Sequence, residues 1–251
     1  MYELSLESSF SHFEQLENIK KQVAEFVSGC GGVIVSGIHC GRGVVTLAVP
    51  SENKDVIKCI VLEKVAETLV SIYKHKFFDK HINSSFLSDE IRSTLIVALS
   101  EFDKNTDVEI AKKNIVFSNY LILDSLYYFK MNELIARWRD VVLLVNANLP
   151  NLVAGDSVVD MMKFLIGTLP SKTNEVYLTM LDDSKYQLFI HDKRAKDKRI
   201  FNTKKDDFEQ SLISELISLS PEKIFIEKTA LSSLKFREKL EGLFDNKIFI
   251  I

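Results

Sequence analysis

The stretch GCGGVIVSGIHCGRGVVTLAV, residues 29–49, places six of the nine glycines of the chain around two short apolar runs. These runs, residues 33–35 and 44–49, are rich in β-branched side chains and predict two strands. Residues 39–43 between them predict a hairpin turn in which Gly41 and Gly43 supply positive φ angles. The alternative is a ligand-binding hairpin with His39 and Arg42 at its tip.

Other chemistry at this hairpin fits the residues less well. A phosphate-binding loop places glycines between a strand and the N-terminus of a helix, whereas here the glycines follow an expected helix over 11–27. Zinc usually needs four ligands in close pairs, but this region offers Cys30, His39 and Cys40 without such a pair. We therefore predict no metal site, no cofactor and no catalytic residue here.

Working outward from the hairpin, alternating residues 2–6 predict a strand, and residues 52–76 predict a long helix. The N-terminal lobe, 1–80, is therefore expected to have the order β-α-β-β-α. The central region, 86–170, reads as helical throughout, with Ser88 as an N-cap and one long helix from Asp107 to about residue 130. Further helices are expected over 131–148 and 156–169, and no strand over 88–168.

The C-terminal lobe, 171–251, returns to α/β patterning. Residues 175–181 and 185–190 predict a β-hairpin, and residues 199–202 predict a third strand. A helix is expected over 206–219. The apolar runs 223–227 and 247–251, separated by a helical pattern over 232–243, predict a β-α-β unit with a parallel strand pair. The fold class expected for the whole chain is α+β.

Composition narrows the broad class of protein. The chain has 251 residues, 46% hydrophobic, with a net charge of −3, which excludes wholesale disorder and a uniformly basic surface. No apolar stretch supplies the about 20 helical residues of a membrane span. Three cysteines without a CxxC pair, and no secretory signal pattern, indicate a reduced, cytoplasmic protein.

Three passages resemble the sporulation-associated YtxC-like family of spore-forming bacteria. They are NYLILDSLYYFKMNEL (119–134), NEVYLTMLDDSKYQLF (174–189) and DDFEQSLISELISLSPEKIFIE (206–227). The resemblance covers residues 107–251, with Ser125, Lys130 and Leu134 standing where the family pattern has Gly, Arg and Tyr. It implies a cytoplasmic protein of a sporulating bacterium, and it supplies no catalytic residues.

The passage HDKRAKDKRIFNTKK, 191–205, is the strongest local charge feature. It holds seven Lys or Arg and two Asp, and we call it the basic hairpin. Such a patch attracts the phosphates of nucleic acid or of an anionic surface, although Phe201 is the only aromatic residue within it. The candidate anion-binding residues are Lys193, Arg194, Lys196, Lys198 and Arg199.

Two further features lie in the central region. Asp124 is the only charge in residues 115–129, so it is a buried acid with a raised pKa, faces water, or pairs with Arg137 or Arg139. An aromatic run suggests either core packing or a groove for a partner. Its members are Tyr120, Tyr127, Tyr128, Phe129 and Trp138.

No linear enzyme motif is present: the chain has no GxSxG, no HExxH and no ordered Ser-His-Asp set. A group comprising His75, Asp79 and His81 reads as a basic helix end instead of a metal site. The first expectation is a non-enzymatic interaction or scaffold protein with a protein partner. The alternatives are binding of nucleic acid through the basic hairpin and binding of a small ligand near His39 and Arg42.

Overall fold

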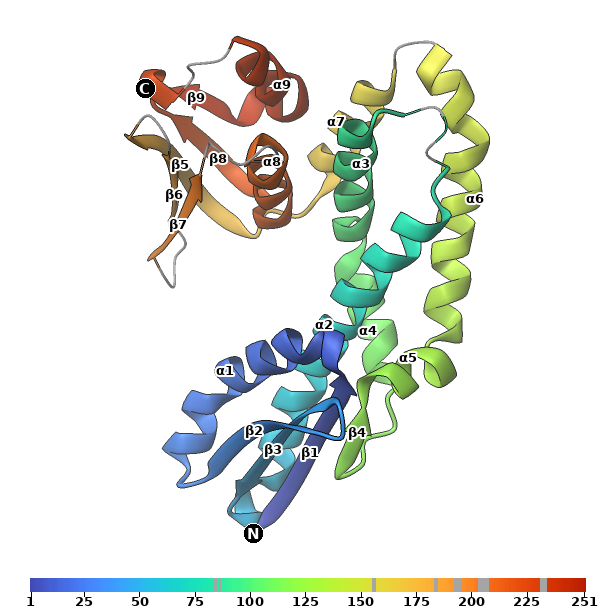
Figure 1. Ribbon diagram of the computed structural model, residues 1–251, viewed down its shortest axis with the longest axis vertical. Coiled ribbons are helices and arrows are strands. Elements are labelled where there is room, and N and C mark those ends of the chain that lie inside the picture. Colours follow the sequence, from blue (N-terminus) through green and yellow to red (C-terminus); the bar gives the residue numbers. More distant parts are fainter. Residues whose placement is uncertain are drawn as a thin grey trace. The chain divides into compact units, whose positions relative to one another are not determined.

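The computed structural model describes residues 1–251 except 84, 86, 155–156, 183–184, 192–195, 203–207 and 231–233. It confirms an α+β protein with two sheets. The chain packs as two compact units: unit 1 comprises Met1–Phe77 and Lys104–Val141, and unit 2 comprises Phe78–Asp103 and Val142–Ile251. The helices α2 (Lys54–His81) and α6 (Asn132–Ala154) each begin in unit 1 and end in unit 2 (Figure 1). The central range 86–170 is therefore divided between the units.

Unit 1 is built on a four-stranded sheet with the order β2-β3-β1-β4. Its strands are β1 (Tyr2–Ser9), β2 (Val33–His39), β3 (Arg42–Val49) and β4 (Tyr120–Ile122). One face buries Leu4, Leu6 and Leu47 against α1 (Phe13–Gly29), and Lys54 and Lys58 of α2 lie over the ring of Tyr2. The apolar alternation along β1 and β3 therefore supplies the core of this unit.

The hairpin between β2 and β3 forms as expected, but its glycines act differently from the expectation. Cys40 and Gly41 have φ angles of 48° and 75°, as a two-residue turn with two positive φ angles requires. Gly43 does not have a positive φ angle. Instead, a Cβ at Gly43 would lie 2.4 Å from Cδ2 of Phe13, so Gly43 is needed for the close packing of α1.

The expectation of one helix from Asp107 to about residue 130 is wrong. Helix α4 (Lys104–Asn114) ends early, β4 follows, and α5 (Leu123–Lys130) begins directly after it. Strand β4 pairs in parallel with β1, with Leu121 opposite Leu6. A short apolar run fits a strand and a buried helix equally well, and the free edge of β1 decides between them here. This strand also corrects the expectation that 88–168 contains none.

Unit 2 combines helices with a five-stranded sheet of order β7-β6-β5-β8-β9. Its strands are β5 (Thr173–Asp182), β6 (Lys185–His191), β7 (Lys196–Asn202), β8 (Pro221–Ile226) and β9 (Ile248–Ile250). Its helices are α3 (Asp89–Glu101), α7 (Val158–Thr168), α8 (Phe208–Leu219) and α9 (Leu234–Phe244). Ser88 caps α3 as expected, because its Oγ accepts a hydrogen bond from Ile91 N.

The hairpin β5–β6 and the parallel pair β8–β9 confirm the expected strand pattern of this lobe. One face of the sheet buries Leu178, Leu188 and Ile224, and Figure 1 shows α8 and α9 lying along one side of it. Tyr186 on this face stacks on Phe208 of α8 and meets Phe236 of α9 edge to face. The side chains that alternate with these point to the opposite face, which we call the open face of the unit 2 sheet.

Candidate functional site

The structure places the two residues proposed for the N-terminal hairpin opposite each other, because His39 of β2 pairs with Arg42 of β3 in the strand register. His39 is exposed at the tip, where its Nε2 lies 3.5 Å from Cys40 Sγ. Arg42 is engaged with Glu7 in an ion pair, and its Nη2 lies 3.4 Å from Asp124 Oδ2. The guanidinium therefore joins strands β1 and β3 to α5, and its charge is already paired with carboxylates of the fold.

Asp124 is the centre of a polar cluster in unit 1, which we call the Asp124 cluster: Asp124, Ser9, His12, Arg42 and Tyr73. The backbone N–H of Ser9 donates to Oδ2 at 2.7 Å, and the Tyr73 hydroxyl donates to Oδ1 at 2.5 Å. His12 Nδ1 lies 3.2 Å from the same Oδ1. The expectation that Asp124 pairs with Arg137 or Arg139 is not met for Arg137, whose Nε lies 3.4 Å from Asp107 Oδ1.

The ionisation of Asp124 differs from the expectation of a raised pKa. Burial alone would raise the pKa of this carboxyl group, but the hydrogen bonds from Tyr73 and Ser9 and the neighbouring His12 outweigh burial. The net effect holds the pKa of Asp124 below its ordinary value. Asp124 is therefore an ionised acceptor that ties four elements together, and it is not poised as a general acid.

The same cluster contains Ser, His and Asp, but its geometry does not fit a catalytic triad. A triad needs the serine on one imidazole nitrogen and the carboxylate on the other. Here Ser9 Oγ lies 3.1 Å from His12 Nδ1, the nitrogen that also faces Asp124. Nε2 faces the ammonium of Lys76 instead. Ser9 is thus not activated as a nucleophile by this arrangement.

A second polar centre of unit 1 was not singled out from the sequence as a site. Asp107 of α4 is 3% exposed, and its Oδ2 lies 2.7 Å from Nζ of Lys74, which is 4% exposed. The indole N–H of Trp138 donates to the same oxygen at 2.9 Å. The sequence does not reveal this role. It places Asp107 in the first turn of a helix, where the helix dipole stabilises an acid without a side-chain partner.

The aromatic run of unit 1 divides into buried and exposed members. Trp138 is 2% exposed and belongs to the core, whereas Tyr127 is half-buried and stacks on Tyr73 with 3.9 Å between ring centroids. Tyr128 and Phe129 are 66% and 73% exposed. Phe129 lines a cavity of about 260 Å³ together with Val116, Tyr120 and Lys130. We call this cavity the β4–α5 groove.

The basic hairpin of unit 2 places its described cations on different faces of β7. Lys193 and Arg194 lie outside the described residues, and of Lys196 only the backbone pairing with His191 is described. Arg199 pairs with Asp197 and with Glu215 of α8, on the helix-covered face. Phe201 pairs in register with buried Tyr186 on that face. Lys198 lies on the open face, with Nζ 5.7 Å from the ring centroid of Phe189.

The open face of the unit 2 sheet carries a line of four aromatic rings, which we call the aromatic row: Phe189, Tyr177, Phe225 and Phe249. In the strand register Tyr177 lies opposite both Phe189 and Phe225, and Phe225 lies opposite Phe249. The Tyr177 and Phe225 rings stack with 4.7 Å between centroids, and Phe225 and Phe249 are 5.4 Å apart. Lys198 continues the same line on β7.

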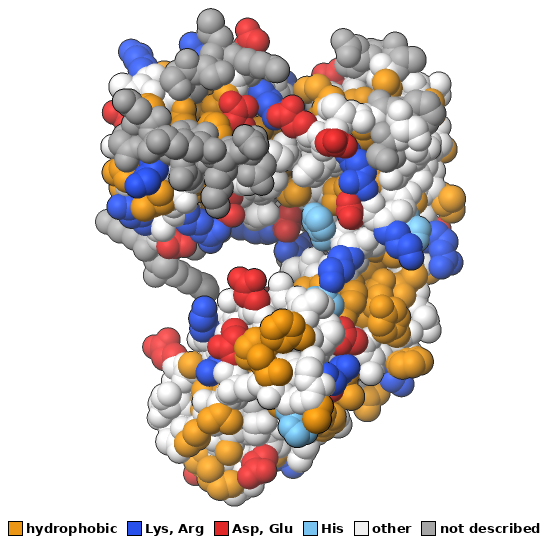
Figure 2. All heavy atoms as spheres, viewed as in Figure 1, with side chains coloured by type: hydrophobic (Ala, Val, Ile, Leu, Met, Phe, Trp, Pro, Cys, Tyr) orange, Lys and Arg blue, Asp and Glu red, His pale blue; other side chains and the backbone are white. Residues whose placement is uncertain are grey.

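The aromatic row is accessible at both ends. Phe189 and Phe249 are 41% and 42% exposed, whereas Tyr177 and Phe225 between them are half-buried. Tyr177 and Phe225 stack on each other, so the ring faces that are open to a ligand are those at the two ends of the row. Figure 2 shows Lys and Arg side chains beside hydrophobic side chains on the visible face of unit 2.

Metal binding and membrane insertion find no support among the described residues. Within the described ranges, no group of three or more His, Cys, Asp or Glu is arranged to hold a metal ion, and Cys30, Cys40 and Cys59 are free thiols. Of the helices described, none is long and apolar enough to cross a membrane.

Comparison with known proteins finds no match for the chain among protein-family models, curated proteins or solved structures. Function is therefore argued from the geometry of its own side chains.

Proposed function

We propose that the chain binds single-stranded nucleic acid through the aromatic row and the adjoining basic hairpin. The observation that supports this function is the register that aligns four rings from four strands beside Lys198. Unpaired bases have flat faces that stack on exposed rings such as Phe189 and Phe249, and Lys198 alongside can contact a phosphate. A duplex keeps its bases stacked on one another, so the row favours single strands.

Charge supports the same surface. The chain as a whole has a net charge of −3, so attraction to phosphate has to be local, and the basic hairpin adjoins the aromatic row through β7. Glu175 accepts a hydrogen bond from the Tyr177 hydroxyl at 2.9 Å and lies opposite Lys223 in the register. The negative charge of Glu175 is therefore offset by Lys223 on the neighbouring strand.

The test is fluorescence anisotropy of a labelled oligothymidine with wild type, Phe189→Ala and Phe249→Ala. Loss of one stacking ring is worth about 1–3 kcal/mol, so each variant should weaken binding by about fivefold to 150-fold. Phe129→Ala, which removes an exposed ring of unit 1, is the matched control and should bind as wild type does. Full affinity in the Phe189→Ala variant would contradict the proposal.

The second candidate function is binding of a protein segment in the β4–α5 groove. The exposed rings of Phe129 and Tyr120 line this apolar cavity and favour such binding. Lys130 in the lining suits a segment with an apolar side chain next to a carboxylate. If Phe189→Ala retains oligonucleotide binding and Phe129→Ala loses it, the oligonucleotide binds at the β4–α5 groove and not at the aromatic row. The resemblance to the YtxC-like family, and with it a cytoplasmic setting in sporulation, stays a prediction.

A further inference from the structure

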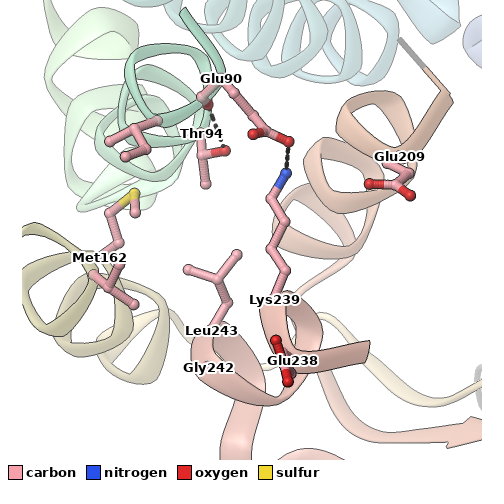
Figure 3. Close-up of a pocket in the computed structure, with 10 residues that line it drawn as sticks. Glu90, Thr94, Met162, Glu209, Glu238, Lys239, Gly242 and Leu243 are labelled. Atoms are coloured by element: carbon pink, nitrogen blue, oxygen red, sulfur yellow. Dashed lines mark hydrogen bonds and ion pairs between the residues drawn. The ribbon is translucent and has the colours of Figure 1, made fainter. Parts of the chain in front are cut away.

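Unit 2 contains a cavity of about 410 Å³ between α3, α7, α8 and α9 (Figure 3). Its volume lies in the range of small-molecule pockets, about 300–1,000 Å³. It is formed by helices and is separate from the aromatic row, which lies on the sheet. The proposal made for it below does not depend on the proposed function.

The walls of the cavity are mainly apolar. Ile91 comes from α3, Val159 and Met162 from α7, and Leu243 from α9. Figure 3 shows Met162 and Leu243 on neighbouring sides of the cavity. Gly242 adds no side chain, and a Cβ there would lie 3.9 Å from Val159 Cγ1, an ordinary contact distance. The open space therefore depends on a residue that lacks a side chain at this point of α9.

Three of the polar side chains in the wall have partners within the protein. Lys239 forms an ion pair with Glu90, drawn in Figure 3. Thr94 Oγ1 donates to the Glu90 carbonyl at 3.0 Å and accepts from Gln210 Nε2 at 3.0 Å. Burial also lowers the pKa of Lys239. This lysine is therefore already neutralised by a carboxylate and is a poor anchor for an anionic ligand.

A carboxylate at the cavity rim is open to a ligand. Glu90 and Lys239 neutralise each other in their ion pair, whereas Glu238 of α9 also lines the cavity. Glu238 is exposed, and among the described residues no side chain is paired with it. A cation at this rim would meet uncompensated negative charge, whereas an anion would be repelled.

We propose that this cavity binds an amphipathic organic cation, an amine whose aliphatic or aromatic body fills the apolar space and whose ammonium lies near Glu238. The apolar walls would supply most of the affinity, and the Glu238 carboxylate would set the preference for positive charge.

The test uses three probes with one alkyl chain and different head groups: octylamine, octanol and octanoate. Isothermal titration calorimetry on the full chain should show octylamine binding about twofold to tenfold more tightly than octanol, with octanoate weakest. Glu238→Gln should reduce the preference for octylamine over octanol, while Glu222→Gln, at an exposed position outside the cavity, should leave it unchanged. Equal affinity for all three probes, or no binding, would overturn the proposal.

The cavity itself is tested with a matched pair of substitutions. Gly242→Leu should fill part of the space and weaken octylamine about tenfold, equivalent to losing burial of about two methylene groups. Gly242→Ala adds one methyl group and should bind octylamine nearly as wild type does. If Gly242→Leu does not fold by circular dichroism, Val159→Phe narrows the cavity from a position that is 42% exposed. Unchanged octylamine binding in a folded, narrowed variant would overturn the proposed site.

Discussion

The two units use polar and aromatic side chains in opposite ways. Unit 1 buries its ionisable groups in paired networks: Asp107 and Lys74 are 3% and 4% exposed and lie in direct contact. Unit 2 leaves Phe189 and Phe249 more than 40% exposed at the ends of an ordered line of rings. Buried groups that satisfy one another stabilise a fold, whereas aligned exposed rings offer a surface to a ligand.

This contrast explains why the polar residues of unit 1 are not the site that we propose. Asp124 collects hydrogen bonds from Ser9 and Tyr73, so its charge is used within the fold. The rings of the aromatic row contact one another across the sheet, and their outer faces are accessible at the two ends of the row. The comparison predicts stability effects from unit 1 variants and binding effects from unit 2 variants.

The largest effect is expected at Asp107. Asp107→Ala removes the carboxylate from a buried ion pair with Lys74 and should lower the free energy of unfolding by about 3–5 kcal/mol. Urea unfolding followed by the fluorescence of Trp138, the single tryptophan and a buried residue of unit 1, measures this directly. Asp140→Ala, at an exposed position of α6, is the control and should change it by less than about 0.5 kcal/mol. Equal effects of the two substitutions would break the contrast between the units.

A smaller effect, dependent on pH, is expected at Asp124. Asp124→Ala leaves the Ser9 N–H and the Tyr73 hydroxyl without their acceptor and should lower the free energy of unfolding by about 1–3 kcal/mol at pH 7. Since the folded-state pKa of Asp124 lies below the ordinary value of 3.8, its ionised form stabilises the fold above that value. The stabilisation is lost as the pH falls through the folded-state pKa.

The same Trp138 fluorescence assay checks this pH dependence. The difference in urea midpoint between wild type and Asp124→Ala should be largest near neutral pH and should shrink below about pH 4. A difference that grows on acidification would mean that Asp124 is protonated in the folded protein at neutral pH, which is the buried-acid alternative.

The smallest effect is expected at Lys198, on the open face of the unit 2 sheet, and it concerns the salt dependence of binding. Lys198→Gln should lower the slope of log affinity against log salt by about 0.7, the value for one phosphate contact with a single strand. Arg199→Gln is the matched control on the same strand, because Arg199 pairs with Glu215 on the helix-covered face. Anisotropy titrations of oligothymidine at several salt concentrations compare the two. A larger change of slope in Arg199→Gln would place the phosphates on the wrong face for our proposal.

Much of the fold could be predicted from local pattern. The strand alternation of residues 2–6, the β2–β3 hairpin and the β8–β9 pair follow from apolar spacing and turn residues. Strand β4 could not be predicted, because three residues of apolar sequence become a strand only through pairing with the edge of β1. The role of Gly43 likewise depends on where the ring of Phe13 lies.

The candidate site could be predicted only in part, for the same reason. The basic hairpin is visible as a charge run, but Phe201 is the only aromatic residue in it and lies on the helix-covered face. The four rings of the aromatic row come from β5, β6, β8 and β9, and strand register alone aligns them. Asp124 stands out in the sequence as an isolated charge, yet its partners come from β1, β3, α2 and the turn before α1.

The most direct test of single-strand binding is ultraviolet cross-linking of oligothymidine to the full chain, with the cross-linked peptides mapped by mass spectrometry. Bases stacked on the aromatic row should attach to Phe189, Tyr177, Phe225 or Phe249, and competition with unlabelled duplex should leave these cross-links largely intact. Cross-links confined to unit 1, or none at low salt, would contradict the account.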